Sequence, residues 1–309
     1  MDMTNAYTVE CRRLTPDEAH YIYSGDICDA GAMDLSRMLA NAFEYYQYDR
    51  VSIQLESPGG KASSLESLMR VISKWERAKK EVTIRSEFKC ASAAALLLSL
   101  SHWGQRRVDR GTTLIYHFVR IDSSIKNLTA TQAEGVAHAL EKMDQQMLSR
   151  LLIRLQTNAD GPQGLLSTIR QRLAFLDQHW SWLDEQMPTS MFSKKAGVNR
   201  PPWHKALGAF CKEGLKTDRA MSLYEKHLFQ RFRLDTPMDL LEAFVLCLID
   251  EIDDVIGPKG AFLAPLERDL IDTPCPVALD TNTNAKINLH GDGEAEQHNR
   301  LSCQRRFQP

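Results

Sequence analysis

The chain has 309 residues, of which 43% are hydrophobic and 25% are charged, and its formal net charge is −2. Such a composition is typical of a globular protein with a sizeable core, arranged as one large domain or two. The near-neutral charge excludes the strong general attraction for nucleic acid or for an anionic membrane that a basic chain has.

No segment reaches the roughly 18–20 apolar residues that a membrane helix needs, and the longest apolar run is Ala91 to Leu100. Residues 1–13 carry early acidic residues and no apolar stretch of the secretory type. The seven cysteines are odd in number and form no CxxC pair, which argues against a disulfide framework or a structural zinc site. We therefore expect a cytoplasmic protein with no membrane or nucleic-acid partner.

Strand and helix patterns alternate in residues 20–156. Alternating apolar residues predict strands over 21–25, 51–55, 82–84 and 113–116. Apolar residues at helical spacing predict helices over 32–46, 65–75, 92–100 and 131–155. This alternation predicts an α/β fold with a largely parallel sheet between helical layers.

The rest of the chain differs in texture. Residues 157–222 hold three of the five tryptophans and a Pro201-Pro202 break, and their helical spacing predicts a partly helical insertion. Residues 223–258 resume the folded pattern with a helix that runs to Leu248. Residues 259–309 are rich in Asn, Asp, Thr and Pro, so we expect a largely disordered tail, and residues 1–19 form a separate N-terminal segment.

A glycine pair follows the second predicted strand, in the sequence Ser57-Pro58-Gly59-Gly60. Glycines allow backbone angles that other residues avoid, so this loop can direct N–H groups at a developing negative charge. Such residues more often mark an ordinary hairpin or strand-to-helix turn.

Three further residues could take part in nucleophilic catalysis. Ser92 lies among small residues at the start of an apolar helix, where the N–H of Ala93 could stabilise an oxyanion, although an N-cap serine is the simpler explanation. His117 ends a strand and could act as a general base, or it could be an ordinary core histidine. Asp235 could orient that imidazole or cap the next helix.

The order and spacing of these residues resemble the proteolytic subunit of ATP-dependent Clp proteases. That family has a strand, the SPGG loop, a helix, a nucleophilic serine among small residues and a histidine after an apolar strand. Here Gly60 and Ser92 are 32 residues apart, and Ser92 and His117 are 25 apart. In the family, the catalytic acid lies fifteen residues before the aspartate of a closing Leu-Ile-Asp sequence. Here that aspartate is Asp250, and fifteen residues before it is Asp235. This position is preferred over Asp160 and Asp177.

The resemblance implies a Clp/crotonase-like fold, a repeated β-β-α superhelix with a long handle helix. It implies a serine endopeptidase in which Ser92 is the nucleophile, His117 the base and Asp235 the orienting acid, with Gly60 and Ala93 forming the oxyanion hole. It further implies a homo-oligomeric ring that cleaves peptides or unfolded proteins. The chain has no P-loop, so an ATP-driven unfoldase would be a separate partner. No metal or organic cofactor is implied.

The chain also departs from the family. Lys89-Cys90-Ala91 precedes the serine in place of a glycine-containing phrase, and Cys247 replaces a glycine before the closing phrase. The insertion stretches the separation of His117 and Asp235 to 118 residues. The alternatives are a crotonase-type acyl-CoA enzyme, a serine-lysine peptidase, a Cys90 nucleophile, and a catalytically inactive ring subunit or binding protein.

Overall fold

The computed structural model describes residues 7–14, 18–102, 104–120, 129–187, 200–212, 215–253 and 255, and the predicted tail over 259–309 lies outside them. All described residues belong to one compact unit, Met1–Phe262. The protein is of the mixed α/β type, as predicted. Its elements, in chain order, are β1 (Tyr7–Leu14), β2 (Glu18–Gly25), α1 (Asp29–Ala40), the π-helical turn η1 (Asn41–Tyr45), β3 (Arg50–Glu56), α2 (Ala62–Arg77), β4 (Glu81–Ser86), β5 (Lys89–Ala91), α3 (Ala93–Leu100), β6 (Arg106–Val108), β7 (Thr113–Ile115), α4 (Ala130–Asn158), α5 (Pro162–Gln186), α6 (Pro202–Phe210), α7 (Thr217–Arg233), β8 (Pro237–Met238), α8 (Leu240–Val245) and β9 (Glu251–Ile252).

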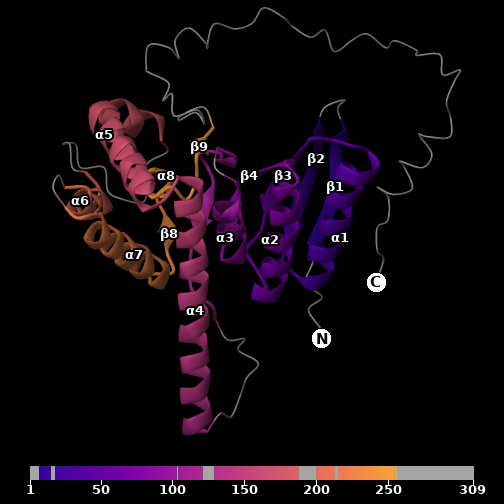
Figure 1. Cartoon of the computed structure of the whole chain (residues 1–309), viewed down its shortest axis with the longest axis horizontal. Helices are drawn as coiled ribbons and strands as arrows, with labels where there is room; N and C mark the ends of the chain where they lie inside the picture. Colours follow the sequence, from indigo (N-terminus) through magenta and orange to yellow (C-terminus); the bar gives the residue numbers. More distant parts are fainter. Residues whose placement is uncertain are drawn as a thin grey trace, which may run out of the picture. The chain divides into compact units, whose positions relative to one another are not determined.

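The main sheet has six strands in the order β1-β2-β3-β4-β6-β9. All neighbouring pairs are parallel except β1 with β2, so the prediction of a largely parallel sheet is confirmed. Residues 7–14, which the sequence analysis set apart in an N-terminal segment, form the edge strand β1. Helices α1 and α2 lie beside this sheet (Figure 1). Helix α2 buries Leu65, Leu68, Ile72 and Trp75, most of its predicted apolar face.

A second, three-stranded sheet joins segments that are far apart in the sequence. Strand β7 lies in the middle, parallel to β5 and antiparallel to β8. Its register pairs Ile115 with Ala91 on one side and with Pro237 on the other. The chain segments that carry Ser92, His117 and Asp235 therefore all adjoin this small sheet.

Helix α4 is only partly packed against the rest of the protein. Its sequence predicts one apolar stripe along its whole length, but the buried residues begin at Leu148 and continue through Leu151 to Leu155. The N-terminal half extends away from the other elements (Figure 1), and Met143 there is 39% exposed. A capping box formed by Thr129 and Gln132 satisfies backbone groups at this end of the helix.

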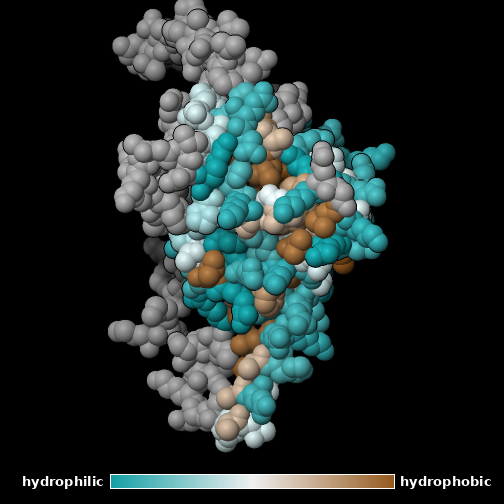
Figure 2. Space-filling model, turned by 90° about the vertical axis from the view of Figure 1, so that its left-hand side faces the viewer, coloured by the Kyte–Doolittle hydropathy of each residue, from teal (hydrophilic) through white to brown (hydrophobic). Residues whose placement is uncertain are grey.

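The described parts of the predicted insertion over 157–222 are largely helical, and its boundaries fall inside α4 and α7. The four residues that predicted the helix, Leu166, Ile169, Leu173 and Leu176, are all buried in α5. Figure 2 shows that the face of the protein on the side of α5, α6 and α7 is mostly hydrophilic. These helices therefore bury their apolar sides in the same compact unit as the sheets.

A buried ionic cluster connects α5 to the C-terminal end of the main sheet. Asp250 accepts hydrogen bonds from both Arg106 on β6 and Arg172 on α5, with Arg106 Nε at 2.7 Å and Arg172 Nη2 at 3.2 Å. The two guanidinium groups also donate to the backbone carbonyls of Ser99, Cys247, Phe244 and Ile249. Burial alone would raise the pKa of the Asp250 carboxyl, but the two arginines overcome this effect and hold its pKa below the usual value.

We predict that Asp250→Asn lowers the free energy of unfolding by about 3–5 kcal/mol, because it leaves two buried guanidinium groups without their counter-charge. Urea unfolding at neutral pH measures this. The control is Glu66→Gln, which breaks an exposed ion pair with Arg150 and should cost less than about 1 kcal/mol.

The same cluster has a defined pH dependence. Because the folded-state pKa of Asp250 is lowered, its contribution is complete above the carboxyl pKa of the unfolded chain and is lost as the pH falls through the folded-state value. Asp250→Asn should therefore make the free energy of unfolding fall less steeply as the pH is lowered. An acid-side pH dependence equal to that of the wild type would contradict this account.

Candidate active site around Ser92

Ser92 occupies a strained backbone conformation between β5 and α3. Its φ of 56° and ψ of −124° lie in a region that residues with a Cβ rarely adopt. Its N–H donates to the carbonyl of Ile115 at 2.8 Å, which ties the residue to β7. Strain of this kind costs on the order of 1–3 kcal/mol and persists only where surrounding structure enforces it, most often at functional sites. No hydrogen bond made by the Ser92 side chain is seen within the described residues.

The Ser57–Gly60 loop lies directly against Ser92. Hydrogen bonds from Ser57 N–H to the Lys89 carbonyl (2.8 Å) and from Ala91 N–H to the Ser57 carbonyl (3.0 Å) fix the loop beside β5. A Cβ placed on Gly59 would lie 2.4 Å from the Ser92 Cβ and 3.0 Å from its Oγ. Glycine is thus required at position 59 by space as well as by its φ of 109°.

The two predicted oxyanion donors lie on either side of this contact. Gly60 follows Gly59 and is held by Ile27, whose N–H donates to the Gly59 carbonyl at 2.7 Å. Ala93 is the first residue of α3, where backbone N–H groups have no partner within the helix. In the described part of the chain, the N–H groups of Gly60 and Ala93 donate to no acceptor. Both are therefore available to a bound group.

His117 is half-buried and lies two residues beyond the end of β7. Its Nδ1 is 2.8 Å from the carbonyl oxygen of Phe118, an atom that can only accept. Nδ1 therefore carries the ring proton in this arrangement, and Nε2 keeps its lone pair. This is the tautomer that a general base needs, although the partner of Nδ1 is a backbone carbonyl where the sequence predicted a carboxylate.

Asp235 is placed near His117 by strand register but is engaged elsewhere. Continuing the pairing of Ile115 with Pro237 by two residues would set Asp235 opposite His117. Its carboxylate, 45% exposed, instead forms an ion pair with Arg120, and no hydrogen bond joins it to His117 among the described residues. The structure therefore pairs Asp235 with Arg120, three residues after His117, and shows no Ser-His-Asp chain of hydrogen bonds among the described residues.

Of the other residues weighed from the sequence, two aspartates lie on the helical segment and Cys90 lies on β5, two residues before Ser92. Asp177 on α5 pairs with Arg200 at 3.1 Å. Asp160 lies in the turn between α4 and α5. Cys90 is fully buried, and burial raises the pKa of its thiol far above the usual value, which opposes formation of the reactive thiolate.

Sequence reasoning missed Asp144 on α4, which lines the same small cavity as His117. Its Oδ1 accepts the N–H of Val119 at 2.8 Å, so it contacts the segment that carries the histidine. The signal that could have found it is its helical position, four residues before the buried Leu148 and four after Leu140, where an apolar residue would be expected.

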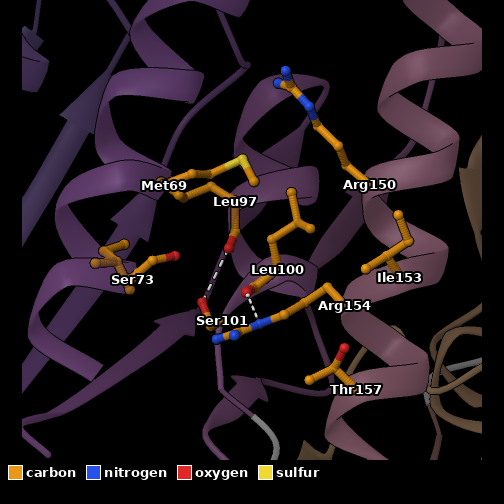
Figure 3. Close-up of a pocket in the computed structure, with 10 residues that line it drawn as sticks. Met69, Ser73, Leu97, Leu100, Ser101, Arg150, Ile153, Arg154 and Thr157 are labelled. Atoms are coloured by element: carbon orange, nitrogen blue, oxygen red, sulfur yellow. Dashed lines mark hydrogen bonds between the residues drawn. The ribbon is translucent and has the colours of Figure 1, made fainter. Parts of the chain in front are cut away.

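A further groove in the described part of the protein is separate from Ser92. It has a volume of about 320 Å³ and lies between α2, α3 and α4 (Figure 3). Met69, Leu97, Leu100 and Ile153 form its apolar lining, and Arg154 on its rim donates to the Leu100 carbonyl at 3.0 Å. These residues come from the C-terminal half of α3, whereas Ser92 precedes the first residue of that helix.

The comparisons with known proteins leave the family open: no family model matches this chain, and no curated protein matches it. Within the residues that the structure describes, no helix is both long and apolar enough to cross a membrane. No group of three or more His, Cys, Asp or Glu side chains in that part is arranged to hold a metal ion.

We predict that Gly59→Ala reduces the reactivity of Ser92 at least about tenfold, because the new methyl group would collide with the serine Cβ. The rate of labelling by a fluorophosphonate probe measures this. Gly104→Ala is the matched control, since Gly104 also has a positive φ (80°) but has nothing within 4 Å of an added Cβ. Equal labelling rates in the two variants would contradict the proposed contact.

Proposed function

We propose that this protein is a serine peptidase of the Clp type, with Ser92 as nucleophile and His117 as general base. The strained Ser92 backbone carries this proposal, because it is enforced from two sides by Gly59 and by the bond to Ile115. A serine that only caps a helix needs no such conformation and usually accepts a hydrogen bond from the first turn, which the Ser92 side chain does not.

The chemistry follows from the groups around Ser92. Its Oγ attacks the carbonyl carbon of a peptide bond while His117 Nε2 takes the hydroxyl proton. The N–H groups of Gly60 and Ala93 stabilise the resulting oxyanion. The C–N bond then breaks, the imidazolium gives its proton to the departing amine, and an ester on Ser92 remains. Water, activated by His117, hydrolyses this ester and regenerates the serine.

Asp235 is the proposed orienting carboxylate, as the sequence predicts. The register of β7 and β8 supports this role, because it brings the two residues to neighbouring strand ends. In the catalytic arrangement Asp235 would exchange its ion pair with Arg120 for a hydrogen bond to His117 Nδ1, which in turn would release the Phe118 carbonyl.

The assembly belongs to the same proposal. The resemblance suggests a Clp/crotonase-like superhelix, a homo-oligomeric ring that receives peptides or unfolded proteins, and a separate ATP-driven unfoldase. The exposed N-terminal half of α4 supports association, since Val136, Leu140 and Met143 recur there at helical spacing and are only partly covered.

One observation favours a second candidate, an inactive ring subunit that keeps the fold. Asp235 is bound to Arg120, and His117 Nδ1 is bound to a backbone carbonyl, so the three predicted residues are not linked to one another. A protein that no longer cleaves peptides would tolerate this arrangement permanently, whereas a peptidase must leave it during each reaction.

We predict that a fluorophosphonate probe labels the wild-type protein and that labelling is lost in both Ser92→Ala and His117→Ala. The probe reacts only with an activated serine, whose oxygen bonds to phosphorus as fluoride leaves. Thermal melting shows that the variants remain folded. A folded wild-type protein that fails to label would favour the inactive subunit.

We further predict that Asp235→Asn lowers the labelling rate by about 10²–10⁴-fold, because an amide cannot hold the reactive tautomer or stabilise the imidazolium. Asp177→Asn is the control and should leave the rate unchanged, since Asp177 pairs with Arg200 on the helical layer. A normal rate in Asp235→Asn would assign the carboxylate role to another residue.

A further inference from the structure

A second carboxylate, which the sequence did not suggest, is bonded to the chain segment that carries His117. Asp144 and His117 both line one small cavity together with the apolar side chains of Leu96, Leu148 and Phe232. Apolar surroundings weaken the solvent screening between charges, so a carboxylate here acts on the ring more strongly than an exposed one.

Asp144 is held in place by a bond to the histidine's own chain segment. The Val119 N–H donates to its Oδ1 at 2.8 Å, only two residues after His117. Four residues further along the helix, Leu148 is buried and anchors this part of α4. The carboxylate therefore has a fixed position relative to the ring.

The charge of Asp144 is not neutralised by another partner. Within the described residues it forms no ion pair with a lysine or arginine, whereas Asp235 is paired with Arg120. Burial raises the pKa of the Asp144 carboxyl, and the negative charge of Glu141 adds to this, while the Val119 N–H and the positive charge of His117 act in the opposite direction.

We propose that Asp144 is a positioning residue that stabilises the protonated form of His117 across the cavity that both side chains line. This inference rests on the proposed function for its role in catalysis, but the interaction between the two groups can be measured without any activity. When Nε2 takes the serine proton, the ring becomes cationic, and the fixed negative charge of Asp144 favours that state.

Other charged groups on neighbouring elements must be considered in any pH experiment. They are Glu141 on α4, Arg120 after β7, Arg233 on α7 and Asp235 before β8. Glu141 supplies the matched control, because it carries the same charge on the same helix and Glu141→Gln leaves the Val119 hydrogen bond intact.

The first test follows the His117 ring by NMR in protein with ¹³C-labelled histidine, in a Ser92→Ala background so that turnover plays no part. The signal is assigned with His117→Gln. In Asp144→Asn the titration midpoint of this signal should move to lower pH by about 0.5–1 unit, because the cationic ring loses a nearby negative charge. Asparagine can still accept the Val119 N–H. Asp144→Ser serves the same purpose if the asparagine variant does not fold.

The second test uses the serine itself. In protein with Ser92 intact, Asp144→Asn should lower the maximal rate of fluorophosphonate labelling. The pH at which labelling is lost on the acid side should also move to lower values. Simple loss of structure does not produce both effects together. An unmoved titration midpoint in Asp144→Asn, or an equal movement in Glu141→Gln, would overturn the proposal even if labelling is normal. If the His117 midpoint moves in Asp144→Asn but the wild-type protein is not labelled by the probe, the interaction between Asp144 and His117 stands and the proposed peptidase activity is rejected.

Discussion

The buried ion pair between Arg106 and Asp250 is the interaction on which the arrangement of the sheets and helices depends. Arg106 lies on β6, next to the C-terminal strand β9, and its guanidinium reaches the backbone at the end of α3 and after α8. Arg172 adds α5 to the same carboxylate. Buried ion pairs contribute little net stability, but removing one member is costly. The cluster therefore acts mainly by permitting only one way of packing these elements together.

This constraint explains how a long helical segment can be accommodated without displacing the candidate site. The chain leaves the small sheet after β7, forms α4 to α7, and returns as β8 on the other edge of the same strand. Phe232 at the end of α7 stacks on Tyr116, with ring centroids 4.9 Å apart and planes 8° from parallel. The helices thus deliver the returning strand to a fixed position beside His117.

The candidate site combines strain with incomplete assembly. Ser92 is held in a strained conformation by Gly59 and β7, while His117 and Asp235 are each bonded to other groups. The Ser92 backbone and the Ser57–Gly60 loop are held in place by short backbone contacts. Completion of the charge network needs side chains to exchange partners, and Asp144 offers a negative charge that is present before that exchange.

The sequence by itself determined the alternating elements and the buried faces of α2 and α5. These features follow from local periodicity. Only the tertiary structure decided that residues 7–14 pair as an edge strand and that α4 is half exposed. It alone also placed Asp235 with Arg120 and Asp144 with His117, because side-chain partners depend on which helices meet in space, and no spacing along the chain encodes that.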